Sequence, residues 1–149
     1  MFGGRKKYYQ EMIRIDRDLN DLDNFITRDA FAKYLGIEVV EFSKGAATAR
    51  LDIQEHHLNS HGTVHGGVIF SLADSVFAVA SNSHEGLAMA INVSISYFKA
   101  VKNGTLTAIA TEESINQKLA TYLVDISDDA GNRVALFLGT VYRKHIIDQ

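Results

Sequence analysis

Two hydrophobic periods follow one another along the chain, the first typical of helices and the second of strands. Between residues 8 and 34, long apolar side chains recur every three or four positions, as one face of an amphipathic helix requires. Because Asn20 and Asp21 interrupt this pattern, we expect one or two helices. After Gly36 the chain changes to short runs of β-prone residues. The recurring apolar side chains are Met12, Ile15, Leu19, Leu22, Ile26 and Phe31.

The runs after Gly36 predict six strands and one further helix. In residues 46–53, apolar and polar side chains alternate, which is the period of a half-buried strand. Turn-forming residues separate several of the strands. The economical arrangement is an α+β fold in which a long antiparallel sheet curls around one central, buried helix. The strands are expected at 36–42, 46–53, 87–98, 105–116, 118–127 and 133–144, and the helix at 65–82.

The helix expected at 65–82 is apolar almost all round, which indicates that it is buried. Only one narrow face is small or polar, and Asp74 lies on it with Gly67, Ser71, Ala78 and Ser81. A buried carboxylate is costly unless it is paired or solvated in a site, and no Lys or Arg lies three or four residues from Asp74. Asp74 is therefore a candidate general base or nucleophile. The alternative is a buried structural carboxylate that accepts hydrogen bonds from loop amides.

The start of the same helix offers a complementary group. His65, Gly66 and Gly67 place two residues without Cβ at a helix N-terminus, where unpaired N–H groups and the positive end of the dipole point outward. Such groups can stabilise an oxyanion, and simple helix entry is the alternative. Gly66 and Asp74 are eight residues apart, hence about 12 Å along the axis. If both serve one reaction, one of them must come from a second copy, which predicts a site at a two-fold dimer interface.

Composition narrows the possible functions. The 149 residues correspond to a single domain. The absence of cysteine excludes disulfide scaffolds, thiolate zinc sites and cysteine nucleophiles. A net charge of -3 offers no positive field for nucleic acid. The basic N-terminus is not followed by an apolar stretch, and the apolar run at 68–80 is too short to cross a bilayer. We therefore expect a cytoplasmic protein without a nucleic-acid or membrane partner.

The same segment supports two other kinds of site, a metal site and a serine nucleophile, less well. His57, His61 and His65 recur every four residues, which would suit a metal site on a helix. The residues between them are poor helix formers and include no acidic ligand, so we expect no metal. Ser71 lacks the Gly-x-Ser-x-Gly elbow of serine hydrolases, which makes it a small space-filling residue rather than a nucleophile.

A long ungapped motif then points to a family. His57-x-Asn59-x-x-Gly62-x-x-His65-Gly66-Gly67-x-x-Phe70-x-Leu72-Ala73-Asp74 resembles the PaaI branch, the phenylacetate-degradation type, of hotdog-fold acyl-CoA thioesterases. The likeness covers about residues 36–144 and includes Ile95-Ser96-Tyr97. It implies a hotdog fold that assembles as a homodimer or homotetramer. We therefore expect a hotdog domain at 36–149, preceded by an N-terminal helical extension at 1–35.

The resemblance also implies roles for individual residues. Asp74 matches the catalytic carboxylate, as general base or nucleophile, and Gly66 matches the glycine whose amide polarises the thioester carbonyl. Asn59 matches the residue that helps to place the water or thioester, and His65 the residue that orients this loop. In the family these groups come from two subunits. No cofactor is implied beyond the CoA of the substrate.

Candidate contacts for CoA, and the acyl group itself, are less well defined. Cations near strand ends could meet the phosphates, Lys102 and Arg143 among them, and Gly67 and Asn82 are further candidates on or beside the central helix. The acyl group is expected to be an arylacetyl group such as phenylacetyl, or a medium-length chain. A non-catalytic acyl-CoA binding or sensor protein is the main alternative, and a hydratase is a third. The carboxylate of Asp74 favours hydrolysis over simple binding, and the Asp/His pair expected of a hydratase is not seen in the sequence.

Overall fold

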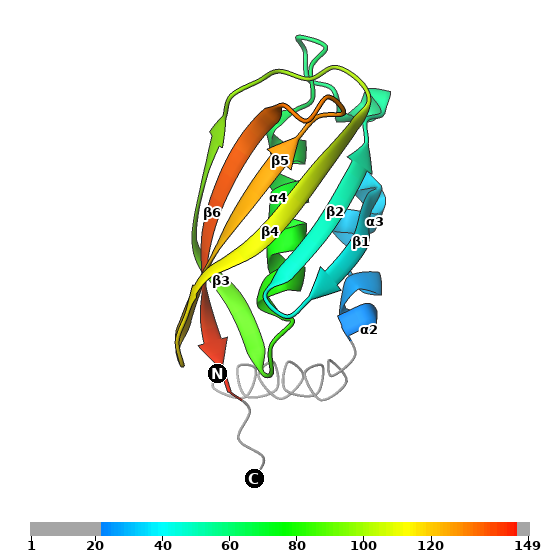
Figure 1. Cartoon of the computed structure of the whole chain (residues 1–149). Coiled ribbons are helices and arrows are strands. Elements are labelled where there is room, and N and C mark those ends of the chain that lie inside the picture. Colours follow the sequence, from blue (N-terminus) through cyan, green and yellow to red (C-terminus); the bar gives the residue numbers. More distant parts are fainter. Residues whose placement is uncertain (1–21, 146–149) are drawn as a thin grey trace, which may run out of the picture.

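Residues 22–145 are described by the computed structural model, in which a curved sheet wraps around one long helix (Figure 1). The predicted helical segment before Leu22 lies outside these residues. The helices are α2 (Leu22–Thr27), α3 (Ala30–Leu35), the short 3-10 helix η1 (Glu55–His57) and α4 (Gly66–Ser81). The strands are β1 (Ile37–Ser43), β2 (Ala46–Asp52), β3 (Leu87–Tyr97), β4 (Thr105–Ile115), β5 (Leu119–Ser127) and β6 (Arg133–Lys144).

The six strands form one antiparallel sheet in the order β1-β2-β4-β5-β6-β3. Each strand begins and ends within a few residues of the predicted bounds. The predicted hotdog fold, an antiparallel sheet around a central helix with N-terminal helices, is confirmed. Leu35 of α3 contributes to the same hydrophobic core as the sheet. Whether residues 1–35 form a separate unit stays a prediction.

The core lies between α4 and the concave face of the sheet (Figure 1). Leu72, Val76 and Phe77 of α4 are completely or almost completely buried there. Phe77 approaches β6 closely because residue 139 is a glycine, and a Cβ at that position would lie 2.7 Å from the Phe77 ring. The rings of Phe77 and Tyr122 pack edge to face, with their centroids 5.8 Å apart.

The expectation that α4 is buried all round is wrong for one face. Gly67 and Asp74 are exposed, and Ser71 and Ala78 are only half-buried. The sheet covers a single side of the helix, and α2 and α3 cover only part of the other side (Figure 1). The sequence marked this face as small or polar, but it did not show which side of α4 the sheet leaves uncovered.

β3 is an edge strand with an open side. It pairs only with β6, and none of its eleven residues is buried. Met89 is 42% exposed and Ile91, at an irregularity in the β3–β6 pairing, is 59% exposed. A long edge strand with exposed apolar side chains is a surface on which a further strand can pair. In the described residues, no helix is long and apolar enough to span a membrane.

Candidate active site

The loop that leads into α4 is organised by the side chain of Asn59. Its Oδ1 accepts hydrogen bonds from the N–H groups of His61 (2.9 Å) and Thr63 (3.2 Å), and its Nδ2 donates to the Thr63 hydroxyl (3.1 Å). The Asn59 N–H also donates to the Thr63 carbonyl at 2.7 Å. Asn59 therefore shapes the approach to α4, and its predicted contact with water or thioester stays a prediction.

His57 lies beneath this loop and is 1% exposed. Its Nδ1 accepts a hydrogen bond from the Gln54 N–H (2.9 Å), so Nε2 carries the proton and donates to the Leu35 carbonyl (2.8 Å). Burial lowers the pKa of the imidazole below its usual value, which favours the neutral form. Both ring nitrogens are thus used in linking α3 to the loop. Across residues 22–145, no cluster of three potential metal ligands is formed.

His65 caps the N-terminus of α4. Its Nδ1 accepts a hydrogen bond from the Gly67 N–H at 2.8 Å, and its own N–H donates to the His57 carbonyl at 2.8 Å. A Cβ on Gly67 would lie 3.0 Å from that Nδ1, so the glycine makes room for the capping ring. One N–H at the helix end is thereby satisfied by a side chain, as an N-cap requires.

Gly66 retains the unpaired donor at this helix end. Its N–H has no acceptor within residues 22–145, while its carbonyl accepts a hydrogen bond from the Tyr97 hydroxyl at 2.9 Å. A Cβ at Gly66 would lie 3.4 Å from the Tyr97 ring, which is ordinary contact. Tyr97 thus holds Gly66 from β3. Its position in the family-like segment Ile95-Ser96-Tyr97 marked it in the sequence, without indicating this contact.

Asp74 lies two turns further along α4, on the exposed face. Its carboxylate has no hydrogen-bond or ion-pair partner in the described part of the chain. Partial desolvation by the surrounding protein raises the pKa of Asp74 above its usual value, and the negative charge of Asp29 raises it further. The alternative of a buried carboxylate held by loop amides is therefore wrong for the single protomer. The role of Asp74 as a base or nucleophile stays a prediction.

Asp29 was not among the residues predicted from the sequence. It is the N-cap of α3, and its Oδ1 accepts a hydrogen bond from the Ala32 N–H at 2.9 Å. An aspartate before a short helix is a recognisable cap signal. Its proximity to Asp74 depends on how α3 packs beside α4, which the sequence pattern does not show.

Ser71 is tied to the backbone of its own helix. Its hydroxyl donates to the Gly67 carbonyl, one turn earlier, at 2.7 Å. Such a bond is the usual way in which a helical serine satisfies its hydroxyl. Ser71 therefore occupies the face between Gly67 and Asp74 as a small residue, in line with the reading that it is not a nucleophile.

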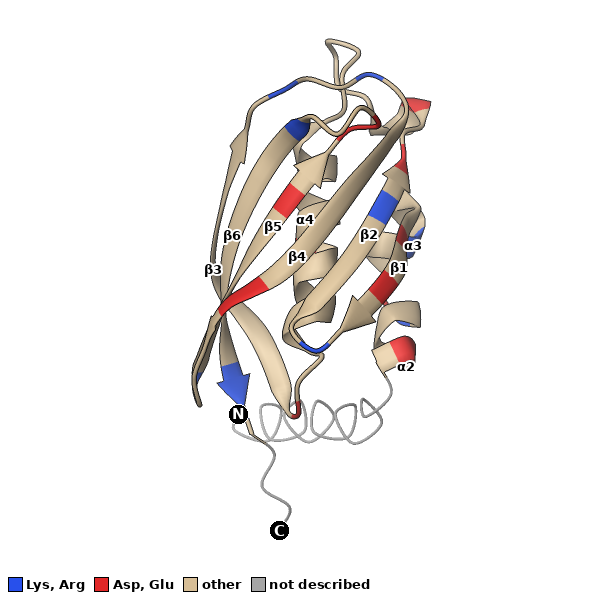
Figure 2. Ribbon diagram, viewed as in Figure 1, with Lys and Arg blue, Asp and Glu red and all other residues tan. Residues whose placement is uncertain are grey.

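The predicted CoA contacts separate into two groups. Gly67 and Lys102 lie at the end of the molecule where α4 begins, since the Val101 carbonyl accepts from the Val64 N–H at 2.8 Å. Figure 2 shows basic positions on the segment that joins β3 to β4 at this end. Asn82 lies at the other end of α4, sixteen residues or about 24 Å away.

Asn82 and Arg143 both lie beside Ala88, near the start of β3. The Asn82 side chain accepts from the Ala88 N–H (3.0 Å) and donates to the Ala88 carbonyl (3.2 Å), and Ala88 pairs with Arg143 in the sheet. The Arg143 guanidinium donates to the Asn116 carbonyl at 2.6 Å. Both side chains therefore make structural hydrogen bonds within the protomer. Their contact with CoA stays a prediction.

Comparison with known proteins places this geometry in a family. The model of the thioesterase superfamily matches residues 61–135. The acyl-coenzyme A thioesterase PaaI of Escherichia coli is 36% identical over 116 residues, which cover 77% of this chain and 83% of the relative.

Solved structures give the same result. The E. coli PaaI protein from the phenylacetic acid degradation operon matches with a TM-score of 0.81 at 31% identity, and the match covers 87% of this chain and 95% of that one. A mutant of the phenylacetic acid degradation protein PaaI from Thermus thermophilus matches with a TM-score of 0.75 at 38% identity, over 78% of this chain and 100% of that one. The chain therefore belongs to the thioesterase superfamily, as a thioester hydrolase of the PaaI-like, hotdog-fold type.

Proposed function

We propose that the chain hydrolyses acyl-CoA thioesters to a free acid and CoA, in sites shared between the two protomers of a homodimer. The observation that carries this proposal is the presence of two unpartnered groups on α4, the N–H of Gly66 and the carboxylate of Asp74, within residues 22–145. Thioester hydrolysis needs a donor for the oxyanion and a base or nucleophile. The acyl-CoA class follows from the relative named as an acyl-coenzyme A thioesterase.

In the proposed reaction, the thioester oxygen accepts a hydrogen bond from the Gly66 N–H, and the positive end of α4 stabilises the charge that develops there. Asp74 removes a proton from water as the water attacks the carbonyl carbon. Alternatively, Asp74 attacks directly and forms an anhydride that water then opens. In either route the C–S bond breaks and the sulfur takes up a proton as CoA leaves. Asn59 is expected to place the water or thioester, and His65 holds the loop.

The raised pKa of Asp74 suits the role of general base. A carboxylate of ordinary acidity is a weak base near neutral pH, and efficiency increases as the pKa of the base approaches the working pH. Desolvation and the charge of Asp29 both act in this direction. The same two causes would also make the carboxylate a better nucleophile, so the pKa supports both routes.

The shared site follows from distance and from the open edge of the sheet. Gly66 and Asp74 of one helix are about 12 Å apart along its axis, too far for one carbonyl to meet both. Antiparallel pairing of β3 with β3 of a second copy would engage the open backbone edge of this strand, along which Met89 and Ile91 are exposed. Such pairing is two-fold symmetric and sets the two α4 helices antiparallel, with Asp74 of each beside Gly66 of the other. A homotetramer of two such dimers would keep the same sites.

Coenzyme A requires cationic and polar contacts near these sites. Lys102 and Gly67 lie at the end of α4 that carries Gly66. Asn82 and Arg143 lie at the other end, which the proposed two-fold axis would bring toward the first end of the second protomer. We propose these four residues as CoA contacts. No cofactor is proposed beyond the CoA of the substrate.

A CoA-release assay with a panel of acyl-CoAs tests the proposal on the wild type and on Asp74→Asn and Asp74→Ala. Phenylacetyl-CoA and medium-chain acyl-CoAs belong in the panel. The wild type is expected to release CoA, and both variants should lose about 100-fold or more in kcat, which is the contribution of a positioned base. Because Asp74 makes no hydrogen bond or ion pair with residues 22–145 of its own protomer, both variants should fold normally, as circular dichroism would show.

The other outcomes separate the alternatives. A wild type that binds acyl-CoA without releasing CoA would be a sensor rather than an enzyme. Full activity in Asp74→Ala would remove Asp74 from the mechanism while leaving the activity in place.

A further inference from the structure

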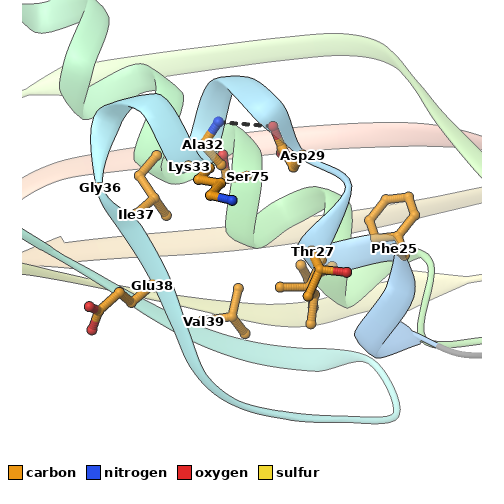
Figure 3. Close-up of a pocket in the computed structure, with 12 residues that line it drawn as sticks. Phe25, Thr27, Asp29, Ala32, Lys33, Gly36, Ile37, Glu38, Val39 and Ser75 are labelled. Atoms are coloured by element: carbon orange, nitrogen blue, oxygen red, sulfur yellow. Dashed lines mark hydrogen bonds between the residues drawn. The ribbon is translucent and has the colours of Figure 1, made fainter.

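A pocket of about 580 Å³ opens between the N-terminal helices and α4 (Figure 3). Residues of α2 and α3 form one side of it, and β1 forms a second. Ser75 and Val79 of α4 form the third. Ser75 directly follows Asp74 in α4, so the residue next to the proposed catalytic carboxylate in the sequence lines the pocket.

The lining of this pocket is mainly hydrocarbon. The two acidic side chains of the lining are engaged elsewhere: Asp29 accepts from the Ala32 N–H (Figure 3), and Glu38 pairs with Arg50 at 3.0 Å. The other polar lining residues are Thr27, Lys33 and Ser75. An apolar pocket with few polar groups is typical of a small-molecule site. The apolar lining residues are Phe25, Ile26, Ala32, Ile37, Val39 and Val79.

The pocket and Asp74 are also connected electrostatically. Asp29 lines the pocket, and its negative charge contributes to the raised pKa of Asp74. Charges influence each other in this way only over short distances, because solvent and ions screen longer ones. Asp29 thus lies near Asp74 as well as in the lining of the pocket.

We propose that this pocket binds the acyl group of the thioester, so that α2 and α3 determine acyl specificity. This inference rests on the function proposed above. With the carbonyl at Asp74, the acyl chain enters beside Ser75 and the CoA portion stays outside. The volume lies within the range of roughly 300–1,000 Å³ that is usual for small-molecule sites. It exceeds what an acetyl group needs and suits a medium-length aliphatic or aryl-substituted acyl group.

Substitutions at Val39 test this proposal, with Val40 as a matched control. Val39 lines the pocket, whereas the neighbouring Val40 does not line it and is 53% exposed. The measurement is kcat/KM for octanoyl-CoA and phenylacetyl-CoA, each divided by kcat/KM for butanoyl-CoA. This ratio is independent of the fraction of enzyme that is folded, because both substrates meet the same preparation.

Val39→Phe should lower both ratios about tenfold or more, since the added ring occupies space that the larger acyl groups need. Val39→Ala should change the octanoyl ratio in the opposite direction. Val40→Phe should leave both ratios as in the wild type. Unchanged ratios in both Val39 variants, with wild-type activity present, would overturn the pocket proposal and leave the proposed function intact.

A direct binding measurement covers the case in which the wild type releases no CoA. That result would overturn the proposed function. The pocket proposal would then be tested by measuring the Kd for octanoate by calorimetry. Val39→Phe should weaken octanoate binding about tenfold or more relative to the wild type and Val40→Phe. Equal affinity in all three proteins would overturn the pocket proposal.

Discussion

Asp74 illustrates how the environment of one residue prepares it for chemistry. The side chain is exposed on the open face of α4, and it has no hydrogen-bond or ion-pair partner within residues 22–145. Neighbouring protein still removes part of its hydration, and Asp29 adds a like charge. Both effects disfavour the ionised form, so the carboxylate is more basic than an ordinary surface aspartate. Its pKa follows from positions on two different helices.

Replacing Asp29 should therefore change the pH dependence of the reaction. In the proposed reaction Asp74 must be ionised to act, so kcat/KM should fall when the pH drops below the pKa of Asp74. Asp29→Asn removes one cause of the raised pKa, and the acid limb of the kcat/KM profile should move to lower pH. The shift should be incomplete, because desolvation is the larger cause and remains. Asparagine caps a helix about as well as aspartate, so α3 keeps its N-cap.

Glu38→Gln is the control for this experiment. Glu38 lines the same pocket, but it pairs with Arg50 and is not among the causes of the Asp74 shift. Its replacement should leave the acid limb where it is. An acid limb that moves to higher pH in Asp29→Asn would contradict the assignment of Asp74 as the ionised group.

The candidate residues were more predictable than their contacts. Gly66 and Asp74 could be chosen from the sequence because helix position and residue type define what each can do. Tyr97 and Asp29 could not be assigned roles, because their partners are 31 and 45 residues away along the chain. Such contacts depend on the packing of β3 and α3 against α4. The exposure of Asp74 was also missed, since burial depends on which side of α4 the sheet covers.

At the scale of elements, alternation and turn residues were sufficient to place all six strands. In β2 and β5 buried residues alternate with less buried ones, which is the period of two that a half-buried strand requires. The irregularities at Val40 in β1 and Ile91 in β3 were not predicted. An extra residue in one strand depends on register with its neighbour, and a single strand's pattern does not contain that information.

The close packing of α4 on β6 predicts a clear effect of Gly139→Ala. The new Cβ would lie 2.7 Å from the Phe77 ring and 2.9 Å from the Phe137 ring, and both rings are buried. Overpacking of this kind usually costs about 1–3 kcal/mol of unfolding free energy, which urea denaturation would measure. Phe77→Leu in the same chain shortens the opposing side chain. The double variant should therefore be more stable than the sum of the two single effects.

For the whole molecule, the proposed function implies that one protomer contributes groups to two different sites. The N–H of Gly66 lies at one end of α4 and Asp74 in its middle, so the proposed site needs a second helix that runs the opposite way. This arrangement predicts complementation between two inactive variants. Asp74→Asn removes the base.

Gly66→Pro removes the amide donor, and its Cβ has ordinary contact distance to the Tyr97 ring. Proline is well tolerated at the first helical position, and the extended His65 (φ -59, ψ 133) suits the residue before a proline.

Co-expression of these two variants should restore activity that neither has alone. In a heterodimer one site carries both defects and the other carries none. Purified heterodimers should therefore have about half of the wild-type specific activity, and a random mixture about a quarter. Heterodimers as inactive as their parents would show that each chain builds its own site.

Under the proposed pairing, the open edge of β3 would make the activity of the enzyme depend on its concentration. If a site exists only where two β3 strands pair, the fraction of active protein follows mass action. Dilution then lowers the number of active dimers and leaves the turnover rate of each dimer unchanged. Association also stabilises the folded state, so the melting temperature should rise with protein concentration. The dissociation constant of the dimer would then act as a threshold for activity. At protein concentrations well below it, most chains are inactive monomers, and at concentrations well above it, nearly every chain belongs to an active dimer.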